Sequence, residues 1–211
     1  MPPTRKSERK ATARADERAL FAGDGLKGDP GRRLRIVEAV IQVVADKGIE
    51  GVTHRAVADA AGLPLGSTTY YFKDKDEFIV AAMALIAQRA VVRMRALLEG
   101  YTAQGMDVVE TLAHLTEELD VRSLDQLVVE YRFSMAPLNR VDLQKASIET
   151  QSKWYDVLRT YLAAHVDPTA VDALMYAFEG ISIRVVTQGY RPTAEEIAPV
   201  YRRIVKSGPK R

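Results

Sequence analysis

The residues best suited to recognising another molecule lie together between positions 66 and 71. Hydroxyl groups can bond to phosphate oxygens, and a glycine lets a backbone come close to a sugar-phosphate chain. This set of residue types therefore favours non-covalent recognition of a nucleic acid. Its members are Gly66, Ser67, Thr69, Tyr70 and Tyr71.

Groups for covalent or metal chemistry are scarce. The chain has no cysteine, which excludes disulfides, thiol nucleophiles and cysteine-based zinc fingers. Its three histidines, His54, His114 and His165, are scattered and have no evident nucleophile or base beside them. Glu110 and His114 have a spacing that metal ligands can adopt, but one histidine among exposed glutamates is more typical of a solvated face. No catalytic residue, metal site or cofactor is predicted.

Two short helices around a glycine would position the candidate residues. Thr53 is a suitable N-cap for a helix from His54 to Ala61, and Gly62 can take the positive φ needed for a sharp turn. A second helix follows from about Leu65 to Phe72. In this geometry one helix enters the major groove of DNA while the other braces it.

The second helix needs an inner face as well as an open one. We expect Leu65, Thr68 and Phe72 to face inward, which leaves the candidate set exposed. Any single aromatic on a helix is more often a core residue. Tyr70, Tyr71 and Phe72 are consecutive, however, so they cannot all point inward.

The remaining chain has the periodicity of helices. Asp29 and Pro30 predict the start of a helix that ends at Gly48, and Asp74 with Glu77 forms a capping box ahead of a helix from Lys75 to about Glu99. No alternating strand pattern is present, so the predicted fold class is all-α with about nine helices. The later helices are expected near Met106 to Leu119, Ser123 to Met135, Arg140 to Ala164, Pro168 to Gln188 and Thr193 to Lys206, with breaks at Gly105, Pro137, Asp167, Gly189 and Pro192.

Charge and composition divide the chain into regions. Residues 1–75 carry a net charge of +4 and residues 76–211 one of −2, which suits a basic end that meets a polyanion. We predict a flexible basic tail over 1–29, a helix-turn-helix domain over 30–78, a ligand-binding and dimerisation domain over 79–206 and a flexible tail over 207–211. The chain has no signal-peptide pattern and no run of 18 apolar residues, so a soluble cytoplasmic protein without membrane contact is expected.

In this order, the features between Arg32 and Phe78 resemble the DNA-binding head of the TetR family of bacterial repressors. The shared pattern is a helix ending in glycine, a Thr-capped helix, Ala-Gly, a short recognition helix with an aromatic end, and a lysine before an acidic helix start. The resemblance implies an all-helical protein with an N-terminal three-helix head and a C-terminal helical-bundle body that dimerises and senses a ligand. It also assigns DNA contacts to Thr53, His54 and Arg55 on the supporting helix, to Gly66, Ser67, Thr69, Tyr70 and Tyr71 on the recognition helix, and to Lys75.

Two positions depart from the family pattern. Pro64 stands where the family commonly has Ser, and Thr68-Thr69 stands where Leu-Tyr is usual. Thr69 is shorter than tyrosine, so the expected contacts shift toward Tyr70 and Tyr71.

The basic candidates also have simpler interpretations. Arg55 can be an ordinary solvated charge instead of a base-reading residue. Lys75 opposes the dipole of its own helix, a small cost that makes more sense if a phosphate sits there.

The body offers candidates for a dimer interface and for a ligand pocket. Core packing within one chain is the alternative for both sets. The dimer candidates are Leu174, Phe178, Ile181, Val185, Ile197, Tyr201 and Ile204, and the pocket candidates are Leu127, Tyr131, Trp154, Tyr155, Leu158 and Tyr161.

The function predicted from these features is a homodimeric, sequence-specific repressor. Its two recognition helices would enter successive major grooves of a palindromic operator, and a small apolar or amphipathic effector would release it. The alternatives are a small-molecule enzyme, which requires a nucleophile and base or a ligand cluster, and a helical interaction module without a DNA target.

Overall fold

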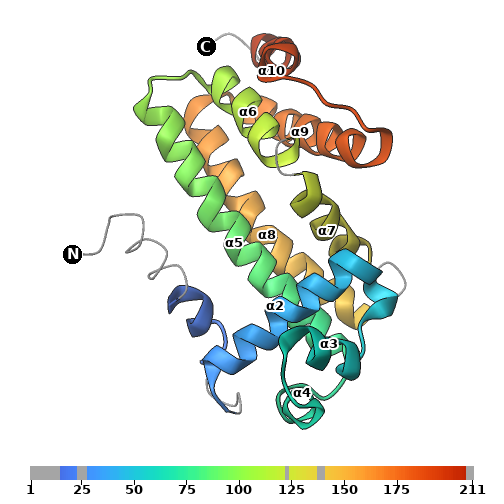
Figure 1. Ribbon diagram of the computed structural model, residues 1–211. Helices are drawn as coiled ribbons and strands as arrows, with labels where there is room; N and C mark the ends of the chain where they lie inside the picture. Colours follow the sequence, from blue (N-terminus) through green and yellow to red (C-terminus); the bar gives the residue numbers. More distant parts are fainter. Residues whose placement is uncertain (1–14, 23–27, 122–123, 137–140, 208–211) are drawn as a thin grey trace, which may run out of the picture. The chain divides into compact units, whose positions relative to one another are not determined.

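The computed structural model describes residues 15–22, 28–121, 124–136 and 141–207. Within these ranges every regular element is a helix, which confirms the predicted all-α class (Figure 1). None of the described helices is long and apolar enough to cross a membrane. The elements are α2 (Pro30–Lys47), η1 (Ile49–Gly51), α3 (His54–Ala61), α4 (Leu65–Tyr71), α5 (Lys75–Ala103), α6 (Val108–Thr116), η2 (Glu117–Val121), α7 (Leu124–Met135), α8 (Val141–His165), α9 (Pro168–Gln188) and α10 (Ala194–Ser207).

The chain forms two compact units. The first combines Met1–Gln88 with Arg132–Thr150, and the second combines Arg89–Tyr131 with Gln151–Arg211. Helices α5, α7 and α8 each contribute residues to both units. The predicted division at residues 29, 78 and 206 follows sequence features instead of packing, and it stays a prediction.

Several helix ends differ from the sequence prediction. Helix α4 stops at Tyr71, and α5 continues to Ala103. The helix expected over 106–119 is α6 followed by the π-helical turn η2. It starts later because Asp107 caps it, in a capping box with Glu110.

Some sequence predictions fall outside the described residues. These are the helix starts at Ser123 and Arg140, the break at Pro137, and residues 1–14, 23–27 and 208–211 of the two tails. Within the N-terminal tail, residues 15–19 are helical instead of unordered, and the side chain of Phe21 is only 6% exposed. Phe21 is the one buried residue within 15–22, and a single buried residue gives no periodic pattern in the sequence.

In the first unit, α2 packs against α3, with Ile36, Val37 and Val57 fully buried. Asp29 caps α2 by accepting hydrogen bonds from two backbone N–H groups, as its position before Pro30 predicts. At the other end of α2, the guanidinium of Arg132 donates to the carbonyl oxygens of Val44 and Ala45, at 2.7 and 2.6 Å. The first helix of the head is therefore fixed at both ends.

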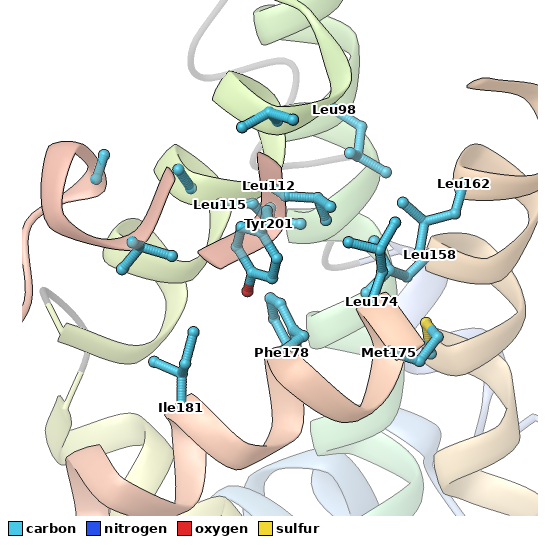
Figure 2. Close-up of a cluster of buried hydrophobic side chains, with 14 of the residues drawn as sticks. Leu98, Leu112, Leu115, Leu158, Leu162, Leu174, Met175, Phe178, Ile181 and Tyr201 are labelled. Carbon is cyan, nitrogen blue, oxygen red and sulfur yellow. The ribbon is translucent and has the colours of Figure 1, made fainter. Parts of the chain in front are cut away.

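In the second unit, a hydrophobic cluster joins α5, α6, α7, α8, α9 and α10. Figure 2 shows Leu174, Phe178 and Tyr201 among its members. The hydroxyl oxygens of Tyr201 and Thr116 are 2.8 Å apart, and Thr116 donates to the carbonyl of Leu112. Tyr201 is therefore the donor in that pair, and its buried hydroxyl is satisfied.

Candidate nucleic-acid interface

Helices α3 and α4 meet at a tight turn (Figure 1). Thr53 caps α3 by accepting a hydrogen bond of 3.1 Å from the N–H of Ala56. Gly62 ends α3 with φ of 60°, a left-handed conformation that strains other residues. A Cβ at Gly62 would also lie 3.2 Å from Nη2 of Arg35. The predicted helix-turn-helix geometry is therefore present, and both the cap and the glycine have the predicted roles.

Helix α4 has one buried face and one open face. Thr68 is fully buried and Phe72 is 1% exposed, as predicted. The prediction for Leu65 is wrong, because its side chain is 52% exposed at the first position of the helix. Tyr70 is 57% exposed, and Gly66 and Thr69 are exposed beside it, whereas Ser67 is half-buried.

Tyr71 corrects the prediction that both tyrosines are open to a partner. Its side chain is 7% exposed, and its hydroxyl accepts a hydrogen bond of 2.9 Å from the N–H of Asp29. A Cβ at Gly28 would lie only 2.5 Å from the Tyr71 ring, so the backbone passes directly against it. Tyr70 contacts Tyr71 edge-on, with ring centroids 5.0 Å apart. Tyr71 therefore anchors α4 to the start of α2 and supports Tyr70.

The His54 side chain packs against other residues of the head and is not fully open to solvent. Its half-buried ring lies 4.8 Å from the ring of Phe78, and its Nδ1 is 3.3 Å from Oγ1 of Thr68. A hydroxyl beside a histidine is a combination that enzymes use for nucleophilic attack. Here Thr68 is fully buried and donates to the carbonyl of Leu65 at 2.8 Å, so the pair holds helices together.

The basic candidates differ in their surroundings. Arg55 is exposed, and it forms no ion pair with any other residue that the structure describes. Lys75 bonds to Glu50 through Nζ and Oε2 at 3.0 Å, with side chains 34% and 95% exposed. A pair this exposed is worth little, so Lys75 can exchange its partner for a phosphate. Lys73, directly after the aromatic run, is also exposed.

The pocket candidates of the body lie within the hydrophobic cluster or against it. Leu127 and Leu158 are buried, and the four aromatic candidates are half-buried against the same cluster. The ring centroids of Trp154 and Tyr155 are 4.2 Å apart. Whether Leu127, Tyr131, Trp154, Tyr155, Leu158 and Tyr161 line a ligand site stays a prediction.

A polar network joins α5, η2 and α7. Gln126 donates to Oε1 of Glu130 at 2.8 Å and accepts a hydrogen bond from Arg93 at 3.2 Å. Arg93 also bonds to the side chain of Glu118. Burial raises the pKa of the Glu130 carboxyl, while Gln126 and Arg93 favour its charged form. The Arg93 guanidinium therefore bonds to Glu118 and also stabilises the charged form of Glu130. Sequence periodicity does not reveal such a network.

Six of the predicted dimer residues are core residues of a single chain. Leu174, Phe178, Ile181, Val185, Ile197 and Tyr201 are buried in the cluster of the second unit, and Ile204 packs against it. The same helices carry large apolar side chains that are exposed. These are Tyr176, Ile183 and Val200, at 72, 47 and 47%.

The sequence is similar to known regulators. Residues 36–82 match the family model described as "Bacterial regulatory proteins, tetR family". The HTH-type transcriptional regulator PksA of Bacillus subtilis is 38% identical over 64 residues, which are 30% of this chain and 31% of that protein. The HTH-type transcriptional repressor KstR2 of Mycobacterium tuberculosis is 24% identical over 195 residues, which cover 84% of this chain and 92% of that protein.

The similarity to solved structures extends over the body. The multidrug binding protein EbrR complexed with imidazole has 33% identity and a TM-score of 0.70, covering 84% of this chain and 96% of that one. A member of the TetR family from Streptomyces coelicolor A3 has 32% identity and a TM-score of 0.69, covering 82% and 98%. Structures of EbrR complexed with ethidium, malachite green and proflavin are similar to this chain as well.

The two neighbouring tyrosines should respond differently to loss of the hydroxyl. Tyr71→Phe removes the acceptor for the N–H of Asp29 and should lower the free energy of unfolding by about 1 kcal/mol. Tyr70→Phe is the matched control and should change it by less than about 0.5 kcal/mol. Urea unfolding at one fixed protein concentration measures both. Equal stabilities of the two variants would contradict the anchoring role of Tyr71.

Proposed function

The chain belongs to the TetR family of bacterial regulatory proteins, and from this membership we propose that it is a dimeric repressor that a small molecule releases from a palindromic operator. The observation that carries the proposal is the open face of α4. Its inner residues are fully engaged, while Gly66, Thr69 and Tyr70 are exposed and Arg55 of α3 has no ion-pair partner among the described residues.

The exposed side chains suit different parts of a DNA groove. The fork of the Arg55 guanidinium matches the acceptors of guanine, and Tyr70 offers a ring and a hydroxyl held against Tyr71. Thr69 donates to the carbonyl of Gly66 at 3.2 Å, so its hydroxyl is already engaged. A Cβ at Gly66 would meet nothing within 4 Å, which leaves room for a sugar-phosphate backbone to approach.

We propose that the dimer forms through the exposed apolar face of α9 and α10. Tyr176, Gly180 and Ile183 are spaced four and three residues apart, so they share one face of α9, and Val200 is exposed on α10. Gly180 has open space beside it, which permits close approach of another helix. In a twofold-symmetric dimer on a palindromic operator, the two recognition helices enter major grooves about 34 Å apart, which is one turn of DNA.

Helix α7 supplies a route from the body to the head. Glu130 belongs to the second unit and Arg132, two residues later, to the first. Arg132 bonds to the last turn of α2 through Val44 and Ala45. An effector that favours another position of α7 would therefore strain or release this contact, which gives it the differential affinity that release requires.

We propose an aromatic cation as the effector. Ethidium, malachite green and proflavin have this chemistry, and EbrR, which is 32 to 33% identical to this chain in these structures, is known with all three. In this chain the adjacent rings of Trp154 and Tyr155, which are tilted by 31° to each other, suit an aromatic ligand. The carboxyl groups of Glu130 and Glu118 belong to the polar network around Arg93, and carboxyl groups suit a cationic ligand.

Substitutions in the head should separate base recognition from phosphate binding. Arg55→Ala and Tyr70→Ala should each cost roughly 1 to 3 kcal/mol in binding an operator that the unaltered protein has selected from genomic DNA, with less effect on a mixed-sequence duplex. Lys75→Ala should weaken binding to both duplexes evenly and flatten the salt dependence. Fluorescence anisotropy measures these affinities, and Lys153→Ala on α8 is the control. Unchanged binding by all three head variants would overturn the assignment.

The proposed dimer face is tested by placing a charge in it. Ile183→Asp should convert the dimer to monomers at micromolar concentration, because an unpaired carboxylate would be buried. Ile148→Asp on α8 is a matched control at another exposed isoleucine, 69% exposed, and should leave the dimer intact. Sedimentation equilibrium distinguishes the two. A dimer that survives Ile183→Asp would show that another surface forms the interface.

The proposed effector site is tested with ethidium in the absence of DNA. Glu130→Gln keeps the shape of the side chain and removes its charge, so ethidium should bind roughly tenfold more weakly. Glu195→Gln, at an exposed position of α10, should have no effect. Fluorescence titration gives both dissociation constants. Equal affinities in the two variants would argue against Glu130 as the countercharge.

A further inference from the structure

A groove lined by arginines lies beside the helix-turn-helix, within the first unit of the chain. It has a volume of about 630 Å³ and runs between the helical stretch 15–19 and the first turns of α2. Arg18 lines it from one side, Arg32 and Arg35 from the other, and Leu63 from the turn between α3 and α4. None of these residues belongs to the DNA contacts considered above.

The charge of the groove is not neutralised by neighbouring side chains. All three arginines are exposed, and none forms an ion pair within the described ranges. Asp29 is the one carboxylate among the residues that line the groove. Its two oxygens already accept hydrogen bonds from the N–H groups of Gly31 and Arg32. The lining therefore has a surplus of two positive charges and five N–H donors on each guanidinium.

Residues of the groove lie next to the turn before α4 and bond to the last residue of α4. At the first end, Nη2 of Arg35 lies 3.2 Å from the place where a Cβ of Gly62 would be, and Leu63 follows directly. At the last residue of α4, the hydroxyl of Tyr71 accepts a hydrogen bond from Asp29, which also lines the groove. A duplex seated on the open face of α4 would bring phosphates of its flanking base pairs close to these arginines.

The stretch that carries Arg18 is held in place before any ligand arrives. Phe21 is buried at 6% exposure, and residues 15–19 are helical. Ordering a free arginine tail on DNA costs conformational entropy, which this packing has removed in advance. Small residues such as Ala15, Ala19 and Gly31 also line the groove and leave room for a bulky sugar-phosphate chain.

We propose that this groove binds the phosphodiester backbone of duplex DNA next to the base pairs read by α4. The planar fork of arginine matches phosphate oxygens, and three guanidinium groups along one groove suit a chain of phosphates. The inference rests on the proposed function, because it extends the surface by which the head holds its operator. Contacts to the backbone carry no sequence information, so the groove adds affinity and register without changing which bases are preferred.

The test compares the full-length double variant R18A/R35A with K145A/K153A, which removes the same charge from exposed positions on α8. Binding of a mixed-sequence 30 bp duplex and of the selected operator is measured by anisotropy between about 50 and 200 mM salt. R18A/R35A should reduce the slope of log K against log salt by about two per subunit. The ratio of operator to mixed-sequence affinity should stay the same, and K145A/K153A should keep the slope of the unaltered protein.

The outcomes separate this inference from the function on which it rests. If R18A/R35A keeps the slope while Arg55→Ala still weakens operator binding, the groove inference is wrong and the repressor function stands. A changed operator preference with an unchanged slope would also overturn it, because the groove would then read bases. If the unaltered protein binds neither duplex, the proposed function itself fails. Thermal unfolding followed by circular dichroism shows whether the variants are folded.

Discussion

The surface of the head depends on how α4 is held from behind. A helix of seven residues has no stability of its own in water, so its neighbours fix both its position and its rotation. Thr68 is fully buried beside His54, and Tyr71 bonds to the backbone of Asp29. These contacts occupy the inner face of α4, so the side chains of the residues between Thr68 and Tyr71 point outward. The exposure of Thr69 and Tyr70 is therefore a consequence of packing.

Local signals made much of the head predictable. A cap at Thr53, a positive φ at Gly62 and the Asp29-Pro30 start depend on residues close in sequence, and all three are found as expected. The roles of Tyr70 and Tyr71 could not be separated in this way. They are neighbours of the same type, and the partner that distinguishes them lies 42 residues away. The periodicity of the sequence does not predict long-range contacts of this kind.

In the body, too, sequence periodicity could not show which residues contact one another. Helix α9 has apolar residues on more than one face, so periodicity finds the stripe from Leu174 to Val185 but cannot say that it faces the chain's own core. Burial shows that it does, and leaves Tyr176 and Ile183 on the surface. The acidic network around Arg93 joins side chains from three separate elements, and only the folded chain brings them together. Much of the structure of the head thus follows from local sequence signals, whereas that of the body is decided by tertiary packing.

Selection of genomic DNA fragments by the purified protein tests most directly whether the open face of α4 reads DNA. The fragments retained from the source organism's genome should share one inverted repeat, and a Tyr70→Ala protein should fail to enrich it. Recovery of fragments without a common sequence, or equal enrichment by the variant, would contradict a sequence-reading role for this helix.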